Sequence, residues 1–215
     1  EVGLKSEFFD HHLKANAALF FTDYDGIQLN IQEGISPVYT NAGNAKIKGA
    51  ELELQAVVAP GLTLNFSGSY IDAYYTSIDA GANFPQYALA DGSTVCPAGP
   101  PICGFAGNGV ALDAKLPKTP KYKMTLHPEY TYVLGNQASL RLITAFTYTA
   151  EMFNDSLNTP LLRRPASRNL DASVHYISAD DKYDLALGGT NITNDRYITV
   201  GSPNYGAGEV GGTYN

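Results

Sequence analysis

Few residues of this chain are of a type and spacing that could do chemistry. Cys96 and Cys103 have six residues between them, in a stretch rich in glycine and proline. That spacing suits a disulfide that closes a small loop in an oxidising compartment, and two free thiols are the alternative. Zinc is not indicated, because the sequence has no second cysteine pair. The cysteines therefore predict a stapled loop.

Three arginines border the segment Asp155–Ser167, namely Arg163, Arg164 and Arg168. A basic cluster in a loop can bind an anionic small molecule through charge-assisted hydrogen bonds. The same charges can instead be solvated or face lipopolysaccharide. We take the three arginines as candidate substrate-loop contacts and keep the second interpretation open.

The motifs of catalysis are absent from the sequence. There is no Gly-x-Ser-x-Gly elbow, no HExxH motif and no phosphate-binding loop. His127 and Glu129 are two residues apart in a predicted strand, so their side chains share a face and could form a structural pair. We assign no catalytic, cofactor-binding or metal-ligating residue, and we expect no enzyme and no cofactor.

The composition narrows the class of protein further. Of the 215 residues, 44% are hydrophobic and only 16% are charged, against roughly 25% charged in a soluble domain. A formal net charge of −7 argues against nucleic acid as a partner. The 15 tyrosines, 9 phenylalanines and 21 glycines favour strands and turns. No run approaches the about 20 consecutive apolar residues that a transmembrane helix needs.

Alternation of apolar and polar residues predicts β-strands, and these strands would position the side chains named above. In Thr63–Tyr70, Leu64, Phe66 and Tyr70 point one way and the intervening polar residues point the other. Similar patterns predict eight strands in all, several of them long: Val2–Phe9, Lys14–Gln32, Ala50–Val58, Thr63–Tyr70, Lys121–Leu134, Ser139–Met152, Arg168–Ser178 and Tyr183–Tyr197.

The connections between these strands alternate in length. Short turns are predicted at Asp10–Leu13, Pro60–Leu62, Gly135–Gln137 and Ala179–Lys182, and long segments at Glu33–Asn44, Ser77–Lys118 and Asp155–Ser167. Long strands with short turns at one end and long loops at the other are typical of an outer-membrane barrel. A soluble β-sandwich is disfavoured, because the polar face carries many charged residues that a sandwich core would not hold. The predicted fold class is all-β, an antiparallel transmembrane β-barrel fragment of about eight meander strands with short periplasmic turns and long extracellular loops.

Several segments, in order, make the chain resemble the C-terminal part of the barrel of TonB-dependent outer-membrane receptors. The segment Asn191–Tyr197 is similar to the Asn-Leu-x-Asp-x-x-Tyr segment near the end of such barrels. The other segments that carry the resemblance are Glu1–Lys5, Phe20–Tyr24 with Gln28, Gly49–Glu53, the Pro60–Leu62 turn, Gly68–Tyr70, and Pro117 with Pro120.

The resemblance implies a large plugged barrel of which residues 1–215 form a C-terminal portion. It implies that the final strand, the plug domain, the TonB box and the earlier strands lie outside this sequence. It further implies active uptake of a scarce nutrient such as a ferric siderophore, with the TonB complex, outer-membrane lipid and a small metal chelate as partners. The long segment Ser77–Lys118 with its two cysteines is then the best candidate for a substrate-contacting or lid element.

Two alternatives to an energised importer remain at this point. One is a passive channel, including a small barrel closed by eight strands. The other is a surface barrel for adhesion or docking, built from the same loops. Alternating aromatic residues near the strand ends are interpreted as girdles at the lipid–water interfaces, with ligand contact at the mouth as the alternative. They include Tyr70, Tyr74, Tyr75, Phe146, Tyr148 and Tyr197. The substrate itself is not fixed by the sequence, because one fold serves many substrates.

Overall fold

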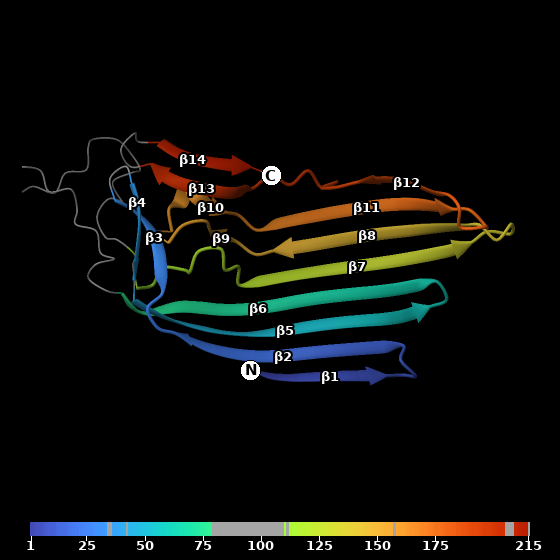
Figure 1. The fold of residues 1–215 in the computed structure, drawn as a ribbon, viewed down its shortest axis with the longest axis horizontal. Coiled ribbons are helices and arrows are strands. Elements are labelled where there is room, and N and C mark those ends of the chain that lie inside the picture. Colours follow the sequence, from blue (N-terminus) through green and yellow to red (C-terminus); the bar gives the residue numbers. More distant parts are fainter. Residues whose placement is uncertain are drawn as a thin grey trace, which may run out of the picture.

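One antiparallel sheet dominates the chain. The computed structural model describes residues 1–33, 36–41, 43–78, 110, 112–156, 158–204 and 209–214. The sheet has eight strands that are neighbours in chain order, which confirms the predicted meander (Figure 1). In order they are β1 (Val2–Phe8), β2 (Leu13–Tyr24), β5 (Gly43–Ala59), β6 (Leu62–Ile78), β7 (Tyr122–Val133), β8 (Ser139–Thr149), β11 (Ser167–Ile177) and β12 (Asp184–Gly189).

Smaller hairpins lie at one end of the sheet, where the long connections run. They are β3 (Gln28–Glu33) with β4 (Ser36–Asn41), β9 (Met152–Phe153) with β10 (Arg163–Arg164), and β13 (Ile198–Asn204) with β14 (Glu209–Tyr214). In the described part of the chain, the 3-10 helix η3 (Pro160–Leu162) leads into β10. The tight turns gather at the opposite end (Figure 1). We call these the loop end and the turn end.

Strand β2 is shorter than its pattern predicts. It ends at Tyr24 instead of continuing to Gln32, because Gly26 adopts a left-handed φ of 67°. The amide of Ile27 then donates to Gly43 O at 2.8 Å. The chain turns away into the separate β3–β4 hairpin, so the alternation from Gln28 onward belongs to a different sheet.

Strand β12 also stops early, at Gly189 rather than Tyr197. Asn191 and Asn194 both have positive φ, 48° and 51°, which asparagine tolerates better than most residues. The amide of Asn191 donates to Asp171 Oδ1 at 2.7 Å. The segment that resembles the receptor family is therefore a turn tied back to β11, and not a continuation of the strand.

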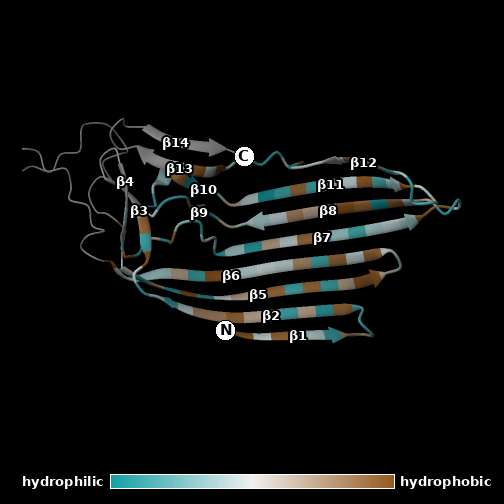
Figure 2. Cartoon of the chain, viewed as in Figure 1, coloured by the Kyte–Doolittle hydropathy of each residue, from teal (hydrophilic) through white to brown (hydrophobic). Residues whose placement is uncertain are grey.

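The register gives the sheet two chemically different faces. One cross-strand row runs through Leu54, Phe66, Leu126, Phe146 and Leu170. The neighbouring row on the other side runs through Glu53, Ser67, Thr125, Thr147 and Asn169. Brown and teal bands alternate along the strands accordingly (Figure 2). We name these the apolar face and the polar face.

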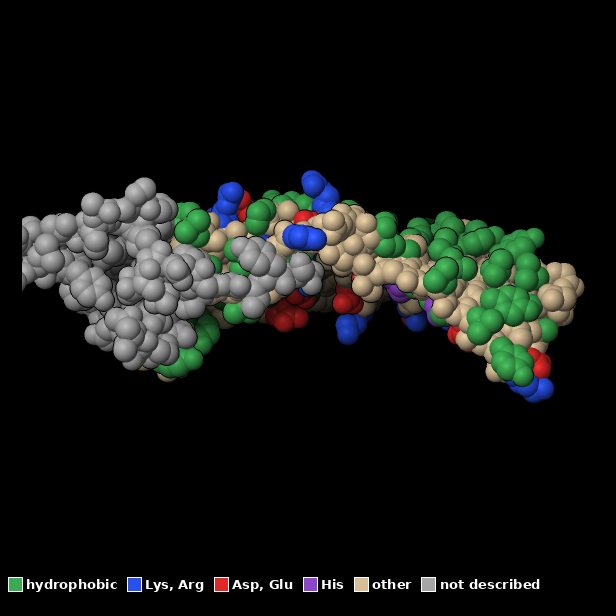
Figure 3. All heavy atoms as spheres, turned by 90° about the horizontal axis from the view of Figure 1, so that it is seen from above, with side chains coloured by type: hydrophobic (Ala, Val, Ile, Leu, Met, Phe, Trp, Pro, Cys, Tyr) green, Lys and Arg blue, Asp and Glu red, His purple; other side chains and the backbone are tan. Residues whose placement is uncertain are grey.

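The apolar face is exposed over much of its area. Leu52, Leu126 and Phe146 each remain 40–42% exposed, and Leu19 is 65% exposed. Figure 3 shows hydrophobic side chains gathered on the upper surface toward the turn end, whereas histidines appear on the lower surface. A soluble protein rarely exposes so large an apolar surface. None of the described residues forms a helix long and apolar enough to cross a membrane.

The sheet is open, because β1 and β12 form its two edges and do not pair with each other. The small eight-stranded closed barrel considered above is therefore not what this chain forms. Its buried core is at the loop end, where Leu29 of β3 and Val110, Ala114 and Leu116 pack on Ala45 and Tyr75. Ala45 and Tyr75 lie opposite each other on the polar face, so loop segments cover that face at this end.

Candidate functional site

The polar face holds a shallow groove that crosses β2, β5, β6 and β7. One part is lined by Lys14, Asn16, Glu53, Gln55, Asn65 and His127, and the adjoining part by Glu51, Ser69 and Lys123; Glu53, Ser67 and Thr125 belong to both. Alternation places these residues on one face, and the antiparallel register brings them side by side. Asn16 Nδ2 donates to Glu53 Oε2 at 3.3 Å, and the hydroxyls of Thr125 and Thr147 lie 3.2 Å apart. The groove is a mixed-charge surface suited to water and polar solutes.

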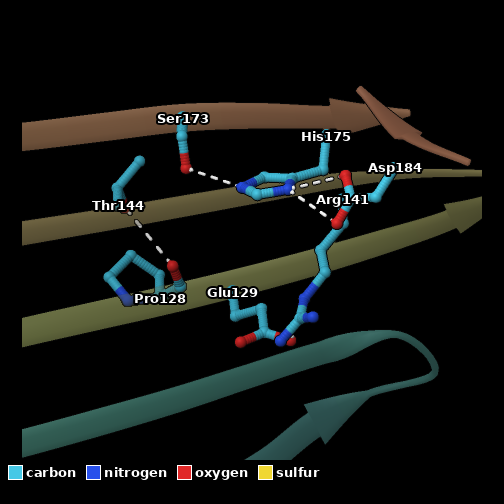
Figure 4. Close-up of polar contacts among 7 residues, drawn as sticks. All are labelled: Pro128, Glu129, Arg141, Thr144, Ser173, His175 and Asp184. Atoms are coloured by element: carbon cyan, nitrogen blue, oxygen red, sulfur yellow. Dashed lines mark hydrogen bonds and ion pairs between the residues drawn. The ribbon is translucent and has the colours of Figure 1, made fainter. Parts of the chain in front are cut away.

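Glu129 pairs with an arginine rather than with the predicted histidine. Arg141 Nε donates to Glu129 Oε1 at 2.7 Å (Figure 4). Glu129 and Arg141 are on neighbouring strands β7 and β8, whereas His127 lines the groove beside Lys14. The predicted His127–Glu129 pair is thus replaced by a cross-strand ion pair, because the register offers Glu129 a stronger donor.

A serine, a histidine and an aspartate form a hydrogen-bonded chain at the edge of the polar face. His175 Nδ1 lies 3.0 Å from Asp184 Oδ1, and its Nε2 lies 3.2 Å from Ser173 Oγ (Figure 4). Ser173 and His175 are two residues apart on β11, and Asp184 begins β12. Asp171, which shares the face with His175, instead accepts from the amide of Asn191 at 2.7 Å.

Pro128 interrupts the ladder between β7 and β8. Cross-strand pairs are found from Lys123 to Leu126 and again from Glu129 to Val133, but not at the two positions between. Proline has no N–H to donate, so this position cannot close both bonds of its pair. The Thr144 hydroxyl donates to Pro128 O at 3.4 Å (Figure 4).

Side chains at the loop end tie three loop segments together. Asn154 is 8% exposed, and its Nδ2 donates to Leu162 O at 3.0 Å and to Ile198 O at 3.3 Å. Asn158 accepts from the amide of Lys115 at 2.7 Å and donates to Lys115 O at 2.8 Å. These contacts join the segments around residues 115, 154–162 and 198 at the loop end of the sheet. We call the joined segments the loop-end frame, or frame.

An ion cluster lies on the same frame. Glu151 accepts from Lys115 Nζ at 2.9 Å and from Arg163 Nη1 at 3.2 Å. The hydrogen bond from Lys115, followed by the charges of Lys115 and Arg163, lowers the pKa of Glu151 from its ordinary value of about 4.5. The carboxylate is therefore ionised at neutral pH and holds two cations at the loop end.

The three candidate arginines do not converge on one surface. Arg163 pairs with Glu151 and is 51% exposed. Arg164 lies over the ring of Tyr197, 3.5 Å from its centroid, and its Nη2 donates to Ser167 Oγ at 2.8 Å. Arg168 is paired with Tyr148 on β8. It is two residues from Leu170 on β11, so it lies on the same, apolar face.

The remaining sequence candidates are placed as follows. Cys96 and Cys103 lie outside the described residues. Among the described residues, no group of three or more His, Cys, Asp or Glu side chains is arranged to hold a metal. Tyr70, Tyr74, Phe146 and Tyr148 lie on the apolar face, as a girdle requires, whereas Tyr75 belongs to the buried core.

Sequence reasoning missed the cross-strand partners at this site. The pairs Glu129–Arg141 and His175–Asp184 join residues 12 and 9 positions apart. The sequence indicates the turns Gly135–Gln137 and Ala179–Lys182 between these strands, so counting outward from each turn places the paired residues in adjacent strands. The loop-end frame had no such signal, because its contacts span up to 44 positions.

An open antiparallel sheet with one apolar and one polar face, tight turns at one end and elaborated loops at the other is a wall segment of a transmembrane β-barrel. A family model described as "TonB dependent receptor-like, beta-barrel" matches residues 1–192. The chain belongs to this family of outer-membrane barrels, so its location is the outer membrane.

Individual relatives agree with this assignment. The chain is 26% identical over 212 residues to PiuA of Acinetobacter baumannii, described as a probable TonB-dependent siderophore receptor, covering 99% of the chain and 25% of that relative. The solved PiuA structure matches with a TM-score of 0.61 and 25% identity, covering 92% of the chain and 24% of that structure. The ferric yersiniabactin uptake receptor FyuA of Yersinia pestis matches in fold, with a TM-score of 0.68 and 21% identity over 99% of the chain and 27% of that structure. The chain thus spans about a quarter of the length of these relatives.

Proposed function

We propose that this chain is a C-terminal portion of the barrel wall of an outer-membrane receptor that imports a ferric siderophore with energy from the TonB complex. The match of the receptor-barrel family to residues 1–192 is the observation that carries the proposal. The description of PiuA from A. baumannii as a probable siderophore receptor supports the choice of siderophore. In this proposal the plug domain, the TonB-contacting segment and the other strands belong to the rest of the parent protein.

The two faces of the sheet have different roles in the barrel wall. The apolar face contacts outer-membrane lipid, because its leucine and phenylalanine side chains are exposed and the charged residues of this face are confined to its loop-end part. The polar face, with its groove and the Glu129–Arg141 and His175–Asp184 pairs, lines the interior. The braced frame at the loop end positions the extracellular loops that meet the substrate.

The substrate contacts remain proposals at the level of single residues. Arg163 remains a candidate contact for an anionic chelate, because its side chain is 51% exposed where it pairs with Glu151. Arg164 is engaged by Tyr197 and Ser167, so we assign it to holding the frame. A disulfide between Cys96 and Cys103 would staple the long loop, and mass spectrometry without reductant tests it: linked loop peptides support the disulfide, and two free thiols refute it.

We assign no enzymatic activity to the Ser173–His175–Asp184 chain. A serine hydrolase also needs free N–H donors beside the attacking oxygen to stabilise the oxyanion. Ser173 is in a strand paired on both sides, with Ile143 on β8 and Gly188 on β12, so its backbone amide serves the ladder. The three residues are better suited to holding β12 against β11 on the polar face.

Uptake measurements test the proposed function. The parent gene is deleted from its host, and uptake of iron-55 is followed for a panel of catecholate, hydroxamate and mixed-ligand ferric chelates under iron limitation. We expect uptake of at least one chelate to fall to background, to return on complementation, and to require an intact TonB gene. Unchanged uptake of every chelate would refute the importer, and uptake that depends on the parent gene but not on TonB would identify a passive channel.

A further inference from the structure

Strand β6 extends past the start of its neighbour β7 at the loop end. The register between the two strands begins at the pair Tyr70–Tyr122, whereas β6 continues to Ile78. Residues 114–121, which lead into β7, lie between β6 and β9 at this level (Figure 1). We call residues 114–121 the strap. The strap occupies the place that a longer β7 would take in the sheet.

The strap is fixed to β6 on one side. The amide of Ile71 donates to Lys121 O at 3.0 Å, and Tyr74 forms an antiparallel bridge with Lys115. Leu116 is 4% exposed and belongs to the buried core at the loop end. The end of the connection between β6 and β7 is therefore held against the sheet.

Prolines prevent the strap from forming a regular ladder on its other side. Pro117 and Pro120 have no N–H to donate. Between them, the amide of Lys118 donates to Phe153 O of β9 at 2.8 Å. Closer to the start of the strap, a side chain makes the link to the connection between β8 and β11.

That side chain is Asn158, whose amide group takes the place of a backbone partner. It accepts from the amide of Lys115 at 2.7 Å and donates to Lys115 O at 2.8 Å. A residue in an antiparallel hydrogen-bonded pair makes the same two bonds with its own N–H and C=O. An asparagine side chain offers both a donor and an acceptor, and asparagine tolerates the positive φ of 54° at this position.

Asn158 is held in place by its own connection. The amide of Thr159 donates to Asp155 Oδ1 at 3.0 Å, and Thr159 is only 2% exposed. The same connection reaches β13 through Asn154, whose Nδ2 donates to Ile198 O at 3.3 Å. A displacement of the β8–β11 connection therefore carries Asn158 with it.

An ion pair between the two connections is a weaker link. Lys115 Nζ pairs with Glu151 at 2.9 Å, but the two side chains are 53% and 44% exposed. Exposed ion pairs contribute little, and this one joins the ends of two long side chains. Asn158 instead binds the backbone of Lys115 directly, so it transmits a displacement with less slack.

We infer that Asn158 couples the two connections, so that the β6–β7 connection and the β8–β11 connection change conformation together. A solute or partner that displaces one connection then displaces the other through the backbone of Lys115. Coupling of this kind is a free energy between two segments, and it is reciprocal. The inference concerns the mechanics of the loop end, so it does not depend on what the barrel transports.

Hydrogen exchange of the full-length receptor in detergent micelles, followed by mass spectrometry, tests the inference. Asn158→Gly removes the side-chain amide but permits the positive φ. The matched control is Asn194→Gly, because Asn194 also has a positive φ, 51°, and its side chain makes no hydrogen bond in the described part of the chain. Heat-modifiable migration on gels verifies that each barrel is folded.

We expect the amides of residues 112–121 to exchange about tenfold faster in Asn158→Gly than in the wild type, because two hydrogen bonds to the strap are lost. In the control, the same amides should exchange within about twofold of the wild-type rate. Equal exchange of residues 112–121 in the two variants would overturn the inference. If Asn158→Gly does not fold, Asn158→Asp, which keeps an acceptor but cannot donate to Lys115 O, is compared with Asn194→Asp by the same criterion.

A second substitution separates coupling from a local loss of stability. Leu116→Ala loosens the strap from its core, and while Asn158 is present it should speed the exchange of residues 154–162 by about threefold or more. In the Asn158→Gly background, adding Leu116→Ala should leave the exchange of residues 154–162 unchanged. An equal increase in both backgrounds, or no increase in either, would overturn the inference.

Discussion

At the scale of single residues, Tyr75 combines burial with an unsatisfied polar group. It is 3% exposed in the loop-end core, and its hydroxyl has no hydrogen-bond partner among the described residues. A buried hydroxyl loses its bonds to water on folding, which costs free energy when no protein partner replaces them. The aromatic ring, and not the hydroxyl, is therefore what stabilises this core.

Replacing Tyr75 with phenylalanine tests this division of roles. Tyr75→Phe should leave the free energy of unfolding of the full-length barrel unchanged or raise it by up to about 1 kcal/mol. Tyr75→Ala, the matched truncation, should lower it by about 3 kcal/mol or more through the cavity it creates. Urea unfolding in detergent micelles, followed by intrinsic fluorescence, measures both. A clear loss of stability in Tyr75→Phe would mean that the hydroxyl has a partner in the whole barrel.

The faces of individual residues could be predicted from the sequence, but their partners could not. Alternation alone put Glu129, Arg141 and His175 on one face. It did not favour Arg141 over His127 as the partner of Glu129, because that choice depends on the register between β7 and β8. Arg163, Arg164 and Arg168 formed one cluster in sequence, yet their side chains take three different environments once a hairpin and a strand intervene.

At the scale of elements, the tight turns decide where each hairpin begins. Gly61 in the β5–β6 turn has a φ of 76°, and a Cβ added there would lie 2.2 Å from Thr131 O. The carbonyl oxygen of Gly61 also accepts from the Thr131 amide at 2.8 Å. The turn therefore packs against β7. Any residue type other than glycine at position 61 would be strained in this conformation.

A pair of glycine substitutions separates this requirement from general turn flexibility. Gly61→Ala should destabilise the barrel by at least about 1 kcal/mol, since alanine is strained at positive φ and its methyl group meets Thr131 O. Gly135→Ala, in the β7–β8 turn, has open space around its Cβ position and should be neutral. The folded fraction after refolding, read from heat-modifiable gel migration, gives the answer; equal yields for both variants would contradict it.

Acidification should release the Glu151 cluster. The pKa of Glu151 is lowered in the folded state, so its pairing stabilises the frame above pH about 4.5 and is lost as the pH falls through the folded pKa. At pH 7 we expect Glu151→Gln to be less stable than the wild type by a few tenths of a kcal/mol to about 1 kcal/mol, after allowing for solvent screening of this 44% exposed side chain. Urea unfolding at pH 7 and pH 3.5 should show the difference shrinking at the lower pH. Glu51→Gln, which removes a carboxylate with no ion pair among the described residues, serves as the control, and a difference independent of pH would count against the effect.

The strands could be predicted where the alternation is continuous. Their ends could not be predicted where a residue with positive φ redirects the backbone. The eight-stranded meander and the alternation of short and long connections follow from period-two patterning. The early ends of β2 and β12 do not, because the residues beyond Gly26 and Gly189 keep an alternating pattern while a left-handed residue redirects the backbone. The small hairpins β3–β4, β9–β10 and β13–β14 are also absent from the prediction.

At the scale of the whole molecule, the open sheet leaves two edges and one apolar face without partners. The edge strands β1 and β12 expose unpaired backbone groups, and leucines such as Leu4, Leu19 and Leu187 are 64–83% exposed. Unpaired edges and apolar surface both promote association in water. The remainder of the barrel and the lipid bilayer are the partners that this surface requires.

Residues 1–215 produced alone should therefore not form a soluble monomer. Size-exclusion chromatography with light scattering, after refolding without detergent, should show aggregates. Refolding in detergent micelles should recover strand signal by circular dichroism, because the detergent covers the apolar face. A stable monomer in detergent-free buffer would contradict the assignment of that face to lipid.

The proline in β7 gives the wall a mechanical property as well as a structural one. Where Pro128 leaves the β7–β8 ladder incomplete, fewer hydrogen bonds resist shear between the two strands than at any fully paired position beside them. We therefore expect β7 and β8 to separate more easily at this point than where the ladder is complete. The Thr144 hydroxyl, which donates to Pro128 O at 3.4 Å, is then a side-chain contact that joins the two strands where the backbone ladder does not.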